Sequence, residues 1–82
     1  MYCVYILKSL TTGRFYTGVT NDIKERLKNH NKGGTKSTKP FKPWRIVYKE
    51  EFTDKRLAYK REFYLKSPKG YLEKRLILTK FI

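Results

Sequence analysis

The shortness of the chain is the feature that most limits its fold. A chain of 82 residues buries only about 60–65% of the surface that it exposes when unfolded, enough for one small core. This length excludes two domains and a large enclosed cofactor pocket, so we expect one domain over residues 1–82. Hydrophobic residues make up 39% and aromatic residues 16% of the chain, too much for a disordered basic tail.

The apolar residues occur only in short runs. The longest run, Tyr2–Leu7, is far below the about 20 residues that a membrane-spanning helix needs. The N-terminus lacks the basic start and apolar stretch of a signal peptide. Cys3 is the only cysteine, which excludes an internal disulfide and a cysteine-rich zinc site. We therefore expect a cytoplasmic protein with no membrane partner, in which Cys3 is a small buried apolar residue.

Positive charge dominates the composition. Twenty Lys and Arg against seven Asp and Glu give a net charge of +13, which disfavours the compact state unless a polyanion neutralises it. Nucleic acid, most simply DNA, is the natural partner, because each phosphate contact releases counterions. The alternatives are a solvated lysine-rich surface and an anionic membrane, for which the chain lacks a long amphipathic helix. The candidate nucleic-acid contacts come from the densest basic stretch and are Lys24, Lys28, Lys32, Lys36, Lys39, Lys42 and Arg45.

The first twenty residues predict an antiparallel hairpin. Tyr2–Lys8 is β-branched and aromatic, as expected of a buried strand, and Phe15–Val19 forms a second short strand. Gly13, in the polar turn between them, can adopt a positive φ. Gly18 inside the second strand indicates a bulge or a close approach of another group to the backbone.

A helix and a lysine-rich loop follow the hairpin. Asp22 can cap the helix, with Glu25 three residues on to complete a capping box. Gly33 and its glycine neighbour end the helix. The segment Lys32–Pro43 holds four lysines, two glycines and two prolines. It is too polar for the core, and we expect it to be mobile.

A third strand is predicted at Trp44–Phe52. Its alternation places Trp44, Ile46 and Tyr48 on one face and the residues between them on the other. Thr53 or Asp54 then opens a second helix that runs to about residue 66. Ser67 followed by proline can open a last amphipathic helix, over residues 70–79. The predicted order is β-β-α-β-α-α, an α+β fold with a small three-stranded antiparallel sheet flanked by about three helices.

One carboxylate breaks the pattern of the second predicted helix. Ala58, Glu62 and Leu65 share one face at the i, i+4, i+7 spacing. A glutamate between an alanine and a leucine is costly to bury unless it is paired or binds a metal ion. A salt bridge to Lys66, four residues on, is the structural alternative.

The first predicted helix has a polar face of its own. Arg26 and His30, the chain's single histidine, lie four residues apart and so share one face. Tyr5 and Tyr16 stand in the two hairpin strands. Each of these residues taken alone has a structural alternative, since strand tyrosines pack well in a core and an isolated helical histidine is usually incidental.

Together these residues suit phosphodiester hydrolysis. That reaction needs an activated water, a cation for the non-bridging oxygens and help for the leaving oxygen. Glu62 could hold Mg²⁺ with several waters still bound. Arg26 could stabilise the developing charge, and His30 with the two phenols could move protons. The chain has no paired aspartates for a two-metal site, so the residues permit a single metal ion.

The order of these residues resembles that of the GIY-YIG nuclease domain. Cys3–Tyr5 stands where that family has Gly-Ile-Tyr, and Tyr16–Gly18 stands where it has Tyr-Ile-Gly. Cys3 replaces the glycine and Thr17 the isoleucine, neither of them at a catalytic position. The resemblance continues through the two helices at Thr20, Asn21, Asp22, Arg26, Leu27, His30, Ala58 and Glu62. It covers essentially the whole chain and is closest to the standalone bacterial members.

The resemblance implies a role for each residue. Tyr5 would be the general base or proton relay for the attacking water, and Tyr16 would line the site. Arg26 would stabilise the transition state, and His30 would assist proton transfer from the tyrosine. Glu62 would be the single protein ligand of Mg²⁺ or Mn²⁺. Gly18 would let the strand approach the active site closely.

The expected function is therefore a metal-dependent endonuclease that hydrolyses DNA, on branched or damaged structures in repair or recombination, with no small-molecule cofactor. One alternative is a non-catalytic module of the same fold that binds DNA or RNA through charge. A third reading, from small size and high pI alone, is a ribosome-associated or assembly protein. Glu62 on an apolar face favours the enzyme, because a module that only binds has no need of it.

Overall fold

The computed structural model describes residues 1–81 of the chain, so Ile82, the last residue of the predicted domain, lies outside the described residues. The elements are β1 (Tyr2–Ser9), β2 (Phe15–Thr20), α1 (Ile23–Lys32), the short 3-10 helix η1 (Lys39–Phe41), β3 (Trp44–Phe52), α2 (Lys55–Lys66), α3 (Pro68–Leu78) and the 3-10 helix η2 (Thr79–Phe81). The sheet is antiparallel with the order β2-β1-β3. The predicted α+β fold and its element order are confirmed. None of the helices in this described part is long and apolar enough to cross a bilayer.

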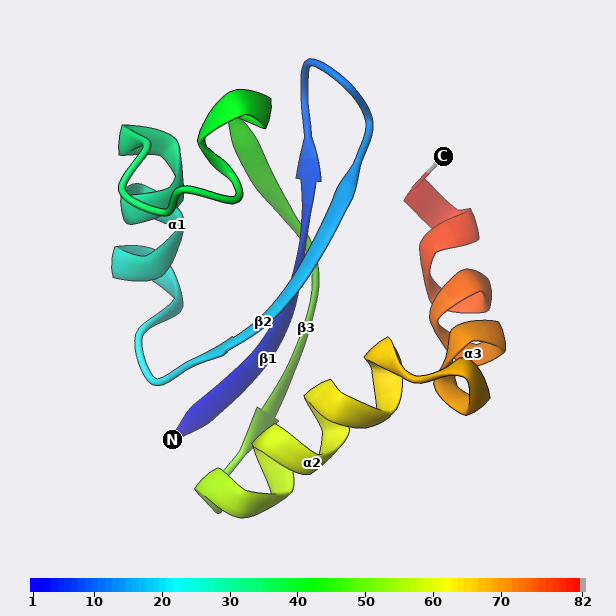
Figure 1. Cartoon of the computed structure of the whole chain (residues 1–82). Coiled ribbons are helices and arrows are strands. Elements are labelled where there is room, and N and C mark those ends of the chain that lie inside the picture. Colours follow the sequence, from blue (N-terminus) through cyan, green and yellow to red (C-terminus); the bar gives the residue numbers. More distant parts are fainter. Residues whose placement is uncertain (82) are drawn as a thin grey trace.

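The central strand β1 is buried on both faces, which explains its continuous apolar sequence. Helix α1 covers one face of the sheet, and α2 and α3 cover the other (Figure 1). On the α1 side, Cys3, Tyr5 and Leu7 form a cluster with the first residue of β3. On the other side, Val4 packs with residues of α2, and Ile6 packs with residues of α3. Cys3 is buried, as expected from its size and chemistry.

Strand β3 does not keep the simple alternation that its sequence suggests. Ile6 of β1 pairs with Tyr48, but Leu7 pairs with Ile46, so Val47 is an extra residue at a register shift. Such a bulge moves the residues beyond it to the other face of the sheet. Tyr48 therefore packs with Ile6 on the α3 side. The prediction that it shares a face with the first residue of the strand is wrong.

Helix α1 begins and ends where its sequence predicts. The Asp22 side chain accepts a hydrogen bond from the Glu25 backbone N–H, and Gly33 ends the helix with φ at 80°. The reciprocal half of the capping box is replaced, because the Asp22 backbone N–H donates to the Thr20 hydroxyl. The side chains of Asp54 and Ser67 cap the other two helices in the same way.

The lysine-rich loop after α1 is tied to the core, contrary to the expectation of a mobile polar segment. Thr38 is only 1% exposed, and its carbonyl accepts a hydrogen bond from the Trp44 indole N–H at 2.9 Å. Asn31 and Trp44 exchange two further hydrogen bonds, through the Asn31 side chain. Phe41 packs edge-on against the Trp44 ring. The polar composition of the loop does not predict these contacts, because each of them depends on a residue outside the loop.

Candidate active site

A cleft opens at the edge of the sheet, beside the end of β2. Strand β2 is an edge strand, so α1 and α2 can approach each other across it. A cavity of about 290 Å³ there is lined by Arg26 of α1, Lys55 and Tyr59 of α2, Tyr2 and the segment 19–21 at the end of β2. The cleft is thus bounded by two helices and floored by strands.

The phenol of Tyr5 lies at the centre of a hydrogen-bonded group beside this cleft. Its oxygen is 3.1 Å from Nε2 of His30 and accepts a bond from Nε of Arg26 at 3.4 Å. Tyr5 is 1% exposed, and His30 is fully buried. The four-residue spacing of Arg26 and His30 on α1 brings both to one side of the helix, directly over β1.

A buried threonine fixes the proton positions on His30. The Thr38 hydroxyl donates its one proton to the Thr35 carbonyl at 3.2 Å. In the assignment that satisfies both contacts at once, its oxygen accepts from Nδ1 of His30, 2.8 Å away. Nδ1 carries the proton in a neutral imidazole, so Nε2 is left as an acceptor for the Tyr5 O–H.

The electrostatics of the site favour this protonation pattern. Burial lowers the pKa of His30 below its usual value, and the positive charge of Arg26 lowers it further. Burial raises the pKa of Tyr5 by more than the hydrogen bond from Arg26 lowers it, with Tyr16 and Glu62 adding to the increase. At neutral pH the resting site holds a neutral imidazole and a protonated phenol.

The second strand supplies the wall and the floor of the site. The Tyr16 ring is 5.0 Å from the His30 ring, centroid to centroid, and 6.3 Å from the Tyr5 ring. A Cβ atom on Gly18 would lie 2.5 Å from the Tyr5 phenol oxygen. Only a residue without a side chain leaves room for the Tyr5 phenol to lie across the β2 backbone.

Glu62 lies on the inner face of α2. Ala58 and Leu65 are buried on either side of it in sequence and pack against Val4. The Glu62 side chain is 20% exposed and pairs with Lys66, whose Nζ is 3.0 Å from Oε2. Both the shared face and the salt bridge to Lys66 were considered from the sequence, and both are present.

Most of the other carboxylates have a role in holding the fold together. Glu50 of β3 and Glu73 of α3 both accept hydrogen bonds from Arg61 of α2. Glu51 pairs with Lys49 at 3.7 Å. Two aspartates cap helices, as described above. Glu62 is thus the carboxylate placed closely enough to influence the pKa of Tyr5.

The donor set suits one hydrated divalent ion. The described residues contain no group of three or more His, Cys, Asp and Glu side chains able to enclose a metal ion. Mg²⁺ is commonly held by one or two carboxylates and keeps several waters, which a single Glu62 would allow.

The predicted nucleic-acid contacts are all exposed but are not gathered at the cleft. Lys24 and Lys28 stand two residues before and after Arg26, about 200° around the helix, so they face away from it. The remaining five lie at the end of α1, in the loop that follows it and at the start of β3, and are Lys32, Lys36, Lys39, Lys42 and Arg45.

Three residues near the site were missed from the sequence. Thr38 sits in a loop whose polar composition gave no sign of burial. Lys55 and Tyr59 line the cleft, and the Lys55 ammonium lies 5.9 Å from the Tyr59 ring centroid. Their spacing from Glu62, at i−7 and i−3 on the same helix, was a signal that could have found them.

A comparison with known families identifies the class of this domain. Residues 1–76 match the family model described as the GIY-YIG catalytic domain. The chain belongs to the GIY-YIG family, a family of nucleases. Membership by itself states the class of the domain and leaves the activity of this chain to be derived from its residues.

Several relatives are similar to this chain over most of its length. A UPF0213 protein of Clostridium perfringens is 42% identical over 83 residues, covering 100% of this chain and 88% of the relative. A UPF0213 protein of Staphylococcus aureus is 40% identical over 75 residues, covering 90% of each. The solution NMR structure of a UPF0213 protein from Bacillus halodurans superimposes with a TM-score of 0.57 at 34% identity, covering 98% of this chain and 86% of that one.

Proposed function

We propose that this protein is a divalent-metal-dependent endonuclease that hydrolyses phosphodiester bonds in DNA, on branched or damaged structures in repair or recombination in the cytoplasm. The observation that carries the proposal is the Tyr5 phenol, bonded between a neutral His30 and the cationic Arg26. A proton acceptor, a cation and a carboxylate that can hold a metal ion are the parts that phosphodiester hydrolysis needs. The net charge of +13 supports a polyanionic substrate.

The first step is a proton transfer through Tyr5. The phenol gives its proton to Nε2 of His30 as its oxygen takes one from the attacking water. The resulting hydroxide oxygen bonds to phosphorus, the bond from phosphorus to the leaving oxygen breaks, and that oxygen takes a proton from solvent. The imidazolium is short-lived, because burial and the Arg26 charge lower the His30 pKa, and its proton returns to solvent through the phenol.

Arg26 serves the phosphate. A guanidinium carries five N–H donors, so it can contact the Tyr5 oxygen and a phosphate oxygen at once. The 3.4 Å bond to Tyr5 is long and is the weaker of the two. Tyr5 is 1% exposed, so the attacking water needs a path to its oxygen. In this proposal a bound phosphate draws Arg26 toward the cleft, and water enters the space that Arg26 leaves.

Glu62 would hold the metal ion. When bound there, Mg²⁺ or Mn²⁺ would supply positive charge to the reacting phosphate. The carboxylate sits on a buried helix face between Ala58 and Leu65, which fixes its position. Tyr16 and Gly18 shape the wall and floor against which the phosphate rests.

A non-catalytic binding module is the second candidate, and one observation favours it. The 3.0 Å ion pair between Glu62 and Lys66 gives the carboxylate a structural partner. In that reading the salt bridge satisfies Glu62 and the chain binds DNA or RNA through charge alone. The two readings differ in what happens to the carboxylate when a divalent ion is added.

The proposal is tested with labelled linear, nicked, branched and single-stranded DNAs, and with structured RNA, each in Mg²⁺, Mn²⁺ or EDTA. We expect wild-type protein to cut at least one DNA only when a divalent ion is present. Glu62→Gln should abolish cutting and keep binding. The matched control is Glu51→Gln, which removes an exposed carboxylate paired with Lys49 and should cut normally.

Each outcome decides between the readings. Binding without cutting on every substrate supports the binding module. Cutting by Glu62→Gln at the wild-type rate overturns the metal site. If the protein cuts only RNA, the proposed hydrolytic chemistry is retained, and the substrate is RNA instead of DNA.

A further inference from the structure

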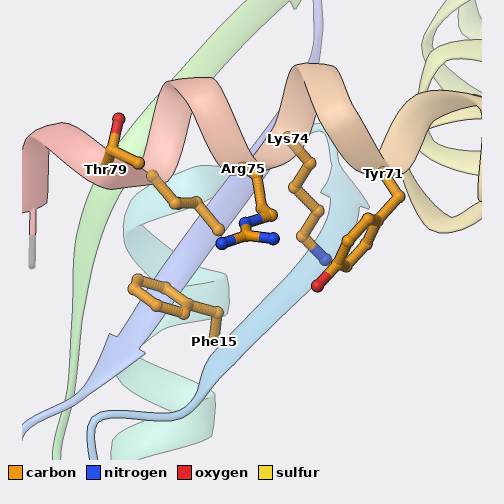
Figure 2. A pocket seen from close by; sticks show the side chains of 6 residues that line it. Phe15, Tyr71, Lys74, Arg75 and Thr79 are labelled. Carbon is orange, nitrogen blue, oxygen red and sulfur yellow. The ribbon is translucent and has the colours of Figure 1, made fainter.

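A second pocket lies between α3 and the start of β2. It has a volume of about 310 Å³ and is lined by six residues: Phe15, Tyr71, Lys74, Arg75, Leu78 and Thr79. The side chains of Tyr71, Lys74 and Arg75 extend from α3 toward β2, and Phe15 projects from β2 toward them (Figure 2). The pocket is at the small end of the range for ligand sites, with an aromatic ring at each end.

Within the part of the chain that the structure describes, the two charged residues that line this pocket, Lys74 and Arg75, are both positive. None of its six lining residues is acidic, and no salt bridge joins Lys74 or Arg75 to a carboxylate within the described part of the chain. Burial lowers the pKa of Lys74, and the charge of Lys66 lowers it further. Cations held together without a carboxylate favour an anionic occupant.

The pocket and the candidate active site share strand β2. Phe15 and Tyr16 are neighbours in the chain and so point to opposite faces of the sheet. Val19 lines the cleft, and it lies four positions along the strand from Phe15, a distance of about 13 Å. A nucleic-acid strand advances about 3.4 Å per stacked nucleotide, so this distance corresponds to roughly four nucleotides.

We propose that this pocket binds an unpaired nucleotide of the substrate, with its base against Phe15 and Tyr71 and its phosphate on Lys74 and Arg75. Aromatic rings beside a positively charged groove are the means by which proteins hold single-stranded nucleic acid without reading its sequence. The inference rests on the proposed nuclease function and deepens it. It assigns the protein a substrate class: DNA with an unpaired stretch next to the cut site.

The test measures binding, in EDTA, of a fluorescently labelled single-stranded DNA and of a blunt duplex of the same length. Tyr71→Ala should weaken single-strand binding about 5- to 100-fold, the usual effect of removing a stacking ring. It should change duplex binding less than about threefold. Phe63→Ala is the matched control, because that ring is 76% exposed on α2 and lies outside the pocket lining.

The cationic half of the pocket is tested separately. Arg75→Ala should weaken single-strand binding and reduce the salt slope of that binding by about one. Lys69→Ala, on the same helix and outside the pocket lining, removes the same charge and should preserve the preference for single strands. A fluorescent adenine analogue in the strand should lose emission on binding wild-type protein and keep it with Tyr71→Ala.

Failure of this inference is distinguishable from failure of the nuclease proposal. If Tyr71→Ala and Phe63→Ala bind single strands equally, the pocket holds no base, whatever the wild type cuts. If the wild type cuts no substrate, and Tyr71→Ala nevertheless weakens single-strand binding, the pocket proposal is supported and the nuclease proposal is wrong. Equal affinity of the wild type for duplex and single strand overturns the assigned substrate class.

Discussion

At the scale of single residues, the site depends on a threonine that touches no substrate. Thr38 accepts from Nδ1 of His30 at 2.8 Å, which leaves Nε2 to accept from Tyr5. The neutral imidazole has two tautomers, and only one of them can take the Tyr5 proton. Thr38 is therefore a positioning residue, which acts on the reaction through His30.

Replacing Thr38 by valine keeps the shape and removes the hydroxyl. We expect Thr38→Val to slow cleavage by about 10-fold to 100-fold, because His30 is then free to adopt the other tautomer. The nitrogen chemical shifts of His30 in ¹⁵N-labelled protein should show Nδ1–H in the wild type and a mixture in the variant. Thr38→Ser restores the hydroxyl and should restore both readouts. A mixture already present in the wild type would contradict the assignment.

The pKa of His30 predicts how stability depends on pH. Burial and Arg26 lower the pKa of His30 in the folded protein, whereas the unfolded chain keeps a value near 6.5. Between these two values the unfolded state binds more protons, so stability is complete above about pH 6.5 and falls as the pH drops toward the folded pKa. Urea unfolding at several pH values should show this fall, and His30→Gln should lose it. Parallel pH profiles for the two proteins would disprove the lowered pKa.

The sequence predicted the site residues that share a helix face and missed those fixed by tertiary contacts. Arg26 with His30, and Ala58 with Glu62, follow from a spacing that the helix itself enforces. Thr38 could not be found in this way, because its burial depends on the Trp44 indole and on His30. The Tyr5 phenol oxygen meets Arg26 and His30 only because α1 packs on the sheet.

At the scale of elements, the junction of α2 and α3 sets the direction of the C-terminal helix. Ser67 caps α3 through the Gly70 backbone N–H. A Cβ atom on Gly70 would overlap the carbonyl oxygen of Tyr64, and backbone cannot move aside as a flexible side chain does. Arg61 adds a second tie, through hydrogen bonds to Glu73 of α3 and Glu50 of β3.

Gly70→Ala should therefore disturb the packing of α3. We expect a loss of about 1–3 kcal/mol in the free energy of unfolding, the usual cost of overpacking, measured by urea denaturation. Lys69→Ala is the control, since that exposed residue occupies the preceding position in the same helix turn. A Gly70→Ala variant as stable as the control would show that the two helices can separate at no cost.

The helices and strands were largely predictable from the sequence. The contacts between them were less predictable. Capping residues mark the starts of α1, α2 and α3, and Gly33 marks the end of α1, since these signals act locally. The bulge at Val47 was not predictable, because a register shift depends on how β3 meets β1. The anchoring of the loop by Thr38 was missed for a similar reason: its partners His30 and Trp44 lie in the elements before and after the loop, and only the packing of those elements brings them to it.

At the scale of the whole molecule, the charge of +13 works against folding. Like charges on a small surface repel, and salt screens them over about 10 Å at 0.1 M. The free energy of unfolding should therefore rise as NaCl increases from about 0.02 to 0.3 M. Urea denaturation at each concentration measures this, and a fall in stability over that range would mean that attractive ion pairs outweigh the repulsion.

The account as a whole rests on the Tyr5 phenol as the group that moves the proton of the attacking water. The most direct measurement is the single-turnover cleavage rate of Tyr5→Phe against the wild type, on the DNA that is cut best, with binding measured in parallel. We predict a rate lower by about 10² or more, with affinity unchanged within about threefold, because the ring still fills its place over Gly18. An unchanged rate with unchanged affinity would contradict the central claim.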